Sequence, residues 1–339
     1  MTRIILILII SNYPIILSGQ SNINEIDIWD YHIIEHTLVV SSQNAPVFKI
    51  IDLEKNKQVA SFGNLGRGPG EILRPGFFNI KKIDNDIIKI YYVEFQINIL
   101  KSFLFNYKNL TATANENIEL PRDFTGLFSE QIISDSLLIG SYDDFFDKRR
   151  HGMRSVIIHT INKNIFDEIL LYKIKSKPFN FSTELNINAR DLLYDSENKL
   201  IITLTLASNI VESINIYSII SKTFYLQADT ALLTNIDPAV FNSDIYLDMY
   251  SQIGKIGNTF FTLQNKKDND IAKNIINLYN ENFELLNTIE LEIGFHFNLA
   301  RTYELNNSII LYGYEGDGFY ELPIIDGELG KLKPLAINL

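Results

Sequence analysis

A unit of about 54 residues repeats along this chain, and it constrains the fold more than any other sequence feature. In each unit a polar turn precedes a short apolar run typical of a β-strand. The turns begin at Glu35, Asp84, Asp135, Glu197, Gly257 and Asn306. Leu38 and Ile309 begin the first and last apolar runs, 271 positions and five intervals apart, which sets the period.

Most units also contain a second β-hairpin. Residues 47–62, 156–171, 214–226 and 275–286 are rich in β-branched and aromatic side chains on either side of a polar turn. Two hairpins make a four-stranded unit. We therefore predict an all-β fold, a six-bladed β-propeller of four-stranded antiparallel blades. A β-sandwich or an irregular β-solenoid is the alternative, but a sandwich would not require a repeat of this length.

Ring closure is a further expectation. In many propellers an N-terminal strand pairs with strands from the C-terminal segment, which removes two exposed sheet edges. The candidates here are residues 26–34 and 309–335.

The N-terminus is typical of a secretory signal. Arg3 precedes the apolar run 4–10, and the small residues Ser18 and Gly19 suit cleavage before Gln20. We expect residues 1–19 to be a signal peptide and residues 20–339 a single propeller domain. An uncleaved anchor helix is the alternative, although Pro14 interrupts it and the run is shorter than about 20 residues.

The same residues predict the compartment. Residues 17–19 resemble the start of a lipoprotein box, but Gln20 stands where the lipidated cysteine belongs, and the chain has no cysteine. We expect an exported protein, periplasmic or extracellular, without a lipid anchor or a membrane span.

Charge and composition exclude several functions. Thirty basic against 41 acidic residues give a net charge of −11, so nucleic acid is not an expected partner. Without cysteine there can be no disulfide, thiolate metal site or thiol nucleophile. We find no catalytic set of residues.

A glycine-rich run follows the first hairpin. Gly63, Gly66, Gly68, Pro69 and Gly70 predict an ordered turn, with positive backbone φ angles and with Glu71 capping backbone amides. The alternative is an anion-binding nest in which Arg67 and Glu71 contact a ligand. A phosphate-binding P-loop is excluded because no Lys-Ser/Thr pair follows the last glycine.

This run resembles a signature of the TolB-like six-bladed β-propeller proteins of Bacteroidota, which often carry Gly-x-x-Gly-x-Gly-Pro-Gly/Asn-Glu after the first blade hairpin. Residues 63–71 match it. The resemblance implies a six-bladed fold and export, often as a lipoprotein, and it supplies no catalytic residues.

One basic cluster is a second candidate ligand site. Arg149, Arg150 and Arg154, with His151, could bind a carboxylate or phosphate. The alternative is a solvated loop whose charge is balanced by the acidic and aromatic stretch 142–147.

Calcium is a weak cofactor candidate and no other cofactor is expected. The pairs Asp84/Asp86, Asp268/Asp270 and Glu315/Asp317 offer oxygen ligands, but turn chemistry explains them equally well.

The sequence thus favours a monomeric binding module for a protein, peptide or glycan. The alternative is a metal-dependent lactonase-like or lyase-like enzyme with its site in the central channel. Acidic and amide side chains that face inward from several blades would favour the enzyme.

Overall fold

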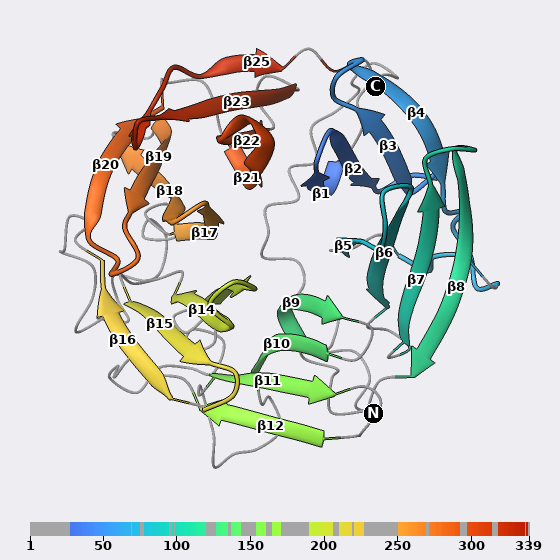
Figure 1. Cartoon of the computed structure of the whole chain (residues 1–339), viewed down its shortest axis with the longest axis horizontal. Coiled ribbons are helices and arrows are strands. Elements are labelled where there is room, and N and C mark those ends of the chain that lie inside the picture. The colour runs from blue at the N-terminus through green and yellow to red at the C-terminus, as the bar shows by residue number, and fades with distance from the viewer. Residues whose placement is uncertain are drawn as a thin grey trace, which may run out of the picture.

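The computed structural model is an all-β ring of antiparallel sheets around a central axis (Figure 1). It describes residues 28–335 and 337, apart from 69, 75–77, 95–96, 98, 120–126, 135–136, 144–153, 161–164, 171–189, 206–209, 219, 227–249, 269–270, 292–296, 314–317 and 336. In Figure 1 the first strand of a sheet lies toward the axis and the last lies at the rim. This is the propeller arrangement that the repeat predicted.

Five sheets have four strands each, and we call them blades 1 to 5. Blades 1 and 2 contain β1 (Ile28–Ile34), β2 (Thr37–Ser42), β3 (Phe48–Asp52) and β4 (Lys57–Phe62), then β5 (Phe78–Lys82), β6 (Ile87–Glu94), β7 (Ile99–Asn106) and β8 (Thr111–Glu119). Blade 3 contains β9 (Leu127–Ser134), β10 (Leu137–Asp143), β11 (Arg154–Thr160) and β12 (Ile165–Leu170). Blades 4 and 5 contain β13 (Arg190–Asp195), β14 (Leu200–Thr205), β15 (Ile210–Asn215) and β16 (Ser221–Tyr225), then β17 (Tyr250–Ile256), β18 (Thr259–Asp268), β19 (Ile271–Tyr279) and β20 (Leu285–Glu290).

The C-terminal sheet departs from the predicted set of six four-stranded blades. It contains β21 (Phe297–Tyr303), β22 (Ser308–Gly313), β23 (Gly318–Ile325), β24 (Glu328–Leu329) and β25 (Lys333–Leu335), with the 3₁₀ turn η6 (Glu304–Asn306) between β21 and β22. Both β24 and β25 pair with β23, one at each end of it. Asp326 and Gly327 adopt positive φ angles of 53° and 82°, which produces the tight turn before β24. The outermost strand of this sheet is therefore split into β24 and β25. The described structure thus has five four-stranded blades where six were predicted.

The expected sharing of a sheet between the two ends of the chain is wrong. Among the described residues, β1 pairs with β2, and β23 pairs with β22, β24 and β25. Side chains hold β1 against β21 instead, because Tyr31, Tyr303, Ile310 and Phe319 share one core cluster.

Polar residues at strand ends set the turns of the repeat. Asp52 Oδ1 accepts hydrogen bonds from the N–H groups of Glu54 and Lys55, at 3.1 and 3.0 Å. The same bonding recurs at Asn106, Asp195 and Asn215, and Asn280 accepts from the N–H groups two and four residues on. Since Asp and Asn readily bond the backbone a few residues on, they explain the polar turns of the second hairpins and, through Asp195, that of one first hairpin.

The hydrophobic core lies between neighbouring sheets. Phe48 of blade 1 packs against Phe78 and Phe103 of blade 2, with ring centroids 5.3 and 5.7 Å apart. Similar clusters join blade 4 to blade 5 and blade 5 to the C-terminal sheet. Within the described ranges there is no helix long and apolar enough to cross a membrane.

Candidate functional site

Polar side chains on the inner strands connect one sheet to the next. Asp191 Oδ2 on β13 accepts the N–H of Ile253 on β17 at 2.8 Å. Gln252 Oε1 on β17 accepts the N–H of Ala300 on β21 at 2.6 Å. Asp30 Oδ2 on β1 lies 3.5 Å from the N–H of Phe78 on β5, a longer contact of the same kind. We call Asp30, Asp191 and Gln252 the inter-blade pins.

Irregular strand pairing accompanies two of these pins. The register of β1 with β2 shifts between Ile28 and Asp30, and that of β17 with β18 shifts between Tyr250 and Gln252. A β-bulge turns the side chain that follows it out of its regular direction. The bulges therefore help to aim Asp30 and Gln252 at the neighbouring sheet.

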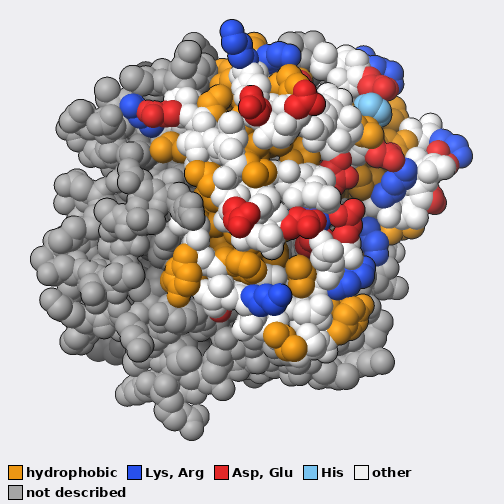
Figure 2. Space-filling model, turned by 60° about the vertical axis from the view of Figure 1, so that its left-hand side comes forward, with side chains coloured by type: hydrophobic (Ala, Val, Ile, Leu, Met, Phe, Trp, Pro, Cys, Tyr) orange, Lys and Arg blue, Asp and Glu red, His pale blue; other side chains and the backbone are white. Residues whose placement is uncertain are grey.

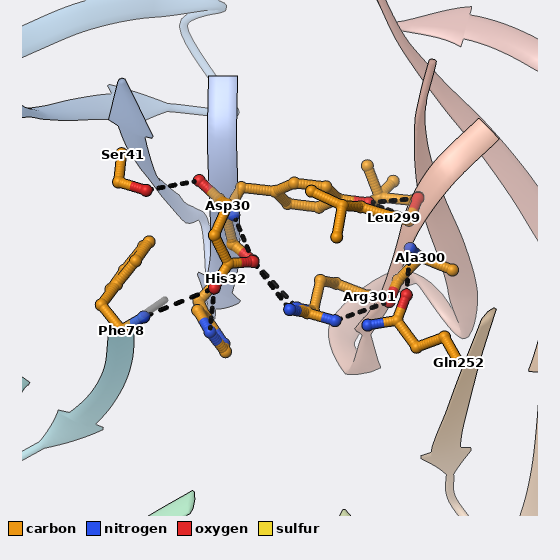
Figure 3. Close-up of polar contacts among 10 residues, drawn as sticks. Asp30, His32, Ser41, Phe78, Gln252, Leu299, Ala300 and Arg301 are labelled. Carbon is orange, nitrogen blue, oxygen red and sulfur yellow. Dashed lines mark hydrogen bonds and ion pairs between the residues drawn. The ribbon is translucent and has the colours of Figure 1, made fainter. Parts of the chain in front are cut away.

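Asp30 is the centre of a polar group at the junction of β1 and β21 (Figure 3). Its Oδ1 accepts from Arg301 Nη2 at 2.7 Å and from the N–H of Tyr31 at 2.8 Å. His32 Nε2 lies 3.4 Å from Oδ2 of the same carboxylate. The Asp30 side chain is 1% exposed, whereas those of His32 and Arg301 are 19% and 20% exposed. We call Asp30, His32 and Arg301 the axial cluster.

The axial cluster is strongly coupled electrostatically. Burial would raise the pKa of Asp30, but the charges of Arg301 and His32 and the hydrogen bonds outweigh it and hold that pKa below its ordinary value. Burial would lower the pKa of Arg301, yet the carboxylates of Asp30 and Asp191 raise it. Two carboxylates thus act on one guanidinium.

The backbone also binds Arg301. Its Nε donates to the Tyr31 carbonyl at 3.0 Å and its Nη1 donates to the Ala300 carbonyl at 3.3 Å. Arginine offers five N–H groups in a rigid plane, so these bonds and the Asp30 bond fix its orientation.

The glycine-rich turn lies between β4 and β5 and folds around the Glu71 carboxylate. Glu71 Oε2 accepts the N–H of Gly68 at 2.6 Å. A Cβ atom added to Gly66 or Gly68 would stand 2.1 or 2.9 Å from that oxygen. Gly63 and Gly70 have the expected positive φ angles of 87° and 77°.

One expectation about this turn is wrong. Gly68 is not among the positive-φ glycines, so the turn needs glycine there for space beside Glu71 and not for its backbone angle.

A buried ion pair between Lys101 on β7 and Glu94 on β6 holds the turn against blade 2. Lys101 Nζ lies 2.6 Å from Glu94 Oε2 and donates to the Glu71 carbonyl at 2.6 Å. Glu94 also accepts the N–H of Leu73. Glu71 is thus part of the internal structure, while Arg67 is exposed.

The other predicted site residues lie only partly within the described ranges. Pro69, Arg149, Arg150 and His151 lie outside them. Arg154 begins β11, opposite Asp143 at the end of β10, and Tyr142 pairs with Leu127 at the start of β9. Arg154 is therefore at the face of the ring where the inner strands begin, which we call the front face. The glycine-rich turn precedes β5 and lies at the same face.

Of the predicted calcium ligands, Asp84 and Asp86 are described, and Asp268 is the last residue of β18, opposite Ile271. Asp84 Oδ1 accepts the N–H of Asp86 at 2.8 Å, and Asp86 pairs with Lys108 at 2.6 Å. The Asp84 carboxylate thus stabilises the turn, and the Lys108 ammonium group occupies the place beside Asp86 that a calcium ion would take. Asp270, Glu315 and Asp317 lie outside the described residues. Within the described part of the chain, no three His, Asp or Glu side chains are grouped as metal ligands.

Sequence reasoning missed the pins and the axial cluster. Asp30, Asp191 and Gln252 each lie two or three residues into the first strand of a unit, and this shared position was the available signal. Arg301 is the fifth residue of the first strand of the last unit, directly after Ala300, and its partner Asp30 is 271 positions away.

Comparison with known proteins supports the fold. No family model matches the chain, and no curated protein matches it. A solved member of the DUF4221 family from Bacteroides vulgatus is 11% identical with a TM-score of 0.60, over 88% of this chain and 90% of that one. A protein from Bacteroides fragilis described as exported is 13% identical with a TM-score of 0.52, over 86% and 81%. A protein from Bacteroides uniformis described as a 6-phosphogluconolactonase is 10% identical with a TM-score of 0.51, over 92% and 96%. These likenesses show the β-propeller fold.

Proposed function

We propose that this protein is a binding module that receives a protein, peptide or glycan at the front face and axis of the ring. The observation that carries the proposal is that the polar side chains on the inner strands are bonded between sheets, whereas two partly exposed side chains beside them are not fully occupied. Asp30, Asp191 and Gln252 accept hydrogen bonds from the backbone of the next sheet, so they hold the ring together. Partly exposed Arg301 and His32 remain beside them to meet a ligand.

The enzyme alternative has less support. It needs acidic and amide side chains from several blades with oxygen atoms available for a metal. Such residues are present on the inner strands, but Asp30 already accepts from a guanidinium and a backbone amide. A pinned carboxylate is a poor metal ligand because coordination would break the bonds between sheets.

The surface away from the axis supports the same location. Exposed apolar side chains on blade 4 include Tyr217, Ile220 and Tyr225. On the side of the ring shown in Figure 2, apolar side chains are interspersed with acidic and basic ones. These three lie in one hairpin, β15–β16, and exposed apolar residues are ordinary on protein surfaces, so they do not by themselves mark a binding site.

Ring closure, family and compartment complete the proposal. The C-terminal sheet acts as a sixth blade, because β21 lies against both β17 and β1. The chain then belongs with the TolB-like six-bladed propellers of Bacteroidota, on the strength of the glycine-rich turn. Export rests on residues 1–19 and the absence of a lipid anchor on Gln20.

Binding and catalysis can be separated in one experiment. The purified chain is titrated by calorimetry with unrelated peptides, with oligosaccharides, and with lactones in the presence of Ca²⁺. We expect saturable binding in the peptide or oligosaccharide series without turnover. Arg67→Glu on the front face should weaken binding, whereas Lys108→Glu in the β7–β8 turn should not. Metal-dependent lactone hydrolysis would refute the binding-module proposal.

A further inference from the structure

Two side chains at the axis, Arg301 with 20% of its side chain exposed and Gln252 with 7% exposure, have hydrogen-bond donors for which no acceptor lies among the described residues. Arg301 uses one N–H of Nε, one of Nη1 and one of Nη2, so two of its five donors remain. Gln252 Oε1 is held by the N–H of Ala300, which directs both donors of Nε2 away from that bond. Within the described ranges neither group meets a further acceptor.

These donors lie close together because both side chains are anchored on one residue. Gln252 accepts from the Ala300 N–H, and Arg301 Nη1 donates to the Ala300 carbonyl (Figure 3). Each is fixed by a hydrogen bond, so little side-chain freedom is lost when a ligand binds. The arrangement is a preorganised donor group.

The surrounding charges select the kind of acceptor. Asp30 is paired with Arg301 at 2.7 Å, and Asp191 also acts on that guanidinium. The positive charge of Arg301 is already balanced by Asp30, and Asp191 adds a second carboxylate, so a carboxylate or phosphate ligand would enter a site that is already negative, which is unfavourable at low dielectric. An uncharged acceptor avoids this repulsion.

The lack of open acceptors on these two side chains favours a carbonyl over a hydroxyl. A sugar hydroxyl carries a proton that needs an acceptor of its own, whereas an amide carbonyl accepts without that need.

We infer that Arg301 and Gln252 form a binding site for an uncharged peptide carbonyl, so that the ligand of this module is a peptide segment inserted at the axis. The inference rests on the proposed binding function and narrows it to peptides.

The test uses small probes on the ¹⁵N-labelled full chain. N-acetylglycine methylamide, acetate and methyl glucoside are titrated separately while the side-chain NMR signals of Arg301 and Gln252 are followed. We expect saturable shifts with the amide, with a Kd on the order of 1–10 mM for so small a ligand. For acetate and the glucoside, we expect the same signals to give a Kd at least tenfold higher.

A variant links the effect to Gln252. Gln252→Glu keeps an oxygen for the Ala300 N–H and removes both Nε2 donors, so amide affinity should fall at least tenfold. Gln58→Glu on the rim strand β4 makes the same change of charge and should leave the affinity unchanged.

Each other outcome overturns the inference. Tighter binding of acetate indicates an anion site, and tighter binding of the glucoside indicates a glycan site. No saturable shift with any probe removes the donor site. In that case binding of a larger ligand that is sensitive to Arg67→Glu would still support the proposed function, so the two ideas fail separately. The probe comparison uses the unmodified chain and holds even if Gln252→Glu does not fold.

Discussion

The phenol of Tyr31 donates a 2.5 Å hydrogen bond to the carbonyl of Ile310, a residue 279 positions later in the chain. The Leu299 carbonyl lies 3.2 Å from the same hydroxyl. Tyr31 is fully buried, and its ring packs against Phe319 at 5.1 Å. One side chain near the start of the described chain thus inserts into the sheet at its end.

Removing that hydroxyl should weaken ring closure. In Tyr31→Phe the buried Ile310 carbonyl loses its side-chain donor, and we expect the free energy of unfolding to fall by about 1–3 kcal/mol. Urea unfolding followed by tryptophan fluorescence measures it. Tyr217→Phe, in an exposed turn, is the control and should be silent. Equal stability of both variants would show that the hydroxyl contributes nothing to closure.

Breaking the ion pair of the axial cluster should cost more. Arg301→Met leaves the Asp30 carboxylate buried without its cation, and we expect a loss of about 3–5 kcal/mol. Asp30→Asn combined with Arg301→Met removes both charges and should recover part of that loss. A double-mutant cycle from denaturant unfolding measures the coupling. Additive effects would contradict the interaction.

Acid should destabilise the ring through Asp30. Its pKa in the folded chain lies below the ordinary 3.8, so the unfolded chain takes up the proton first as pH falls. The stabilisation is therefore complete well above pH 3.8 and is lost as pH falls through the folded pKa. Asp30→Asn should be less stable than the natural chain at pH 7, and the difference should narrow in acid. Urea midpoints from pH 7 to pH 3 test this, and a difference that does not change with pH would contradict it.

The glycine-rich turn should depend on space around Glu71. A Cβ at Gly66 would displace the carboxylate from the Gly68 N–H, so Gly66→Ala should cost about 1.5–3 kcal/mol. In a Glu71→Ala background the same change should cost less, because the obstructing oxygen is absent, and the φ of 159° at Gly66 accounts for the cost that remains. Arg67→Ala, between the two glycines, should be nearly neutral in thermal melts. An equal cost of Gly66→Ala in both backgrounds would locate the strain elsewhere.

Truncation should test closure as a whole. Deleting residues from Gly318 onward removes β23 to β25 and the ring contact of Phe319 with Tyr31. We expect loss of cooperative unfolding and aggregation through exposed sheet edges. An open solenoid would lose only its terminal unit. A soluble truncated chain with one sharp transition would contradict closure by the C-terminal sheet.

Local sequence predicted much of the fold and little of the site. Strand Phe48–Asp52 and its turn could be read from neighbouring residues, because Asp52 bonds the backbone two and three positions away. The pairing of Asp30 with Arg301 could not, since nothing near either residue specifies a partner 271 positions distant. The glycine-rich turn could be predicted in part. Its residues predicted an ordered loop around Glu71, but the reason for Gly68 depends on where that carboxylate points.

The inter-blade pins have a consequence for how such rings diverge. In each pin the donor is a backbone N–H, which any residue except proline supplies, so Ile253, Ala300 and Phe78 are unconstrained in that role. The acceptor can be an aspartate or a glutamine, as Asp191 and Gln252 show. Each pin thus requires a particular kind of side chain only at the acceptor. The donor position, which supplies a backbone N–H, can be replaced by almost any residue. In this ring, the residues that donate to the pins can therefore change identity while the sheets stay connected.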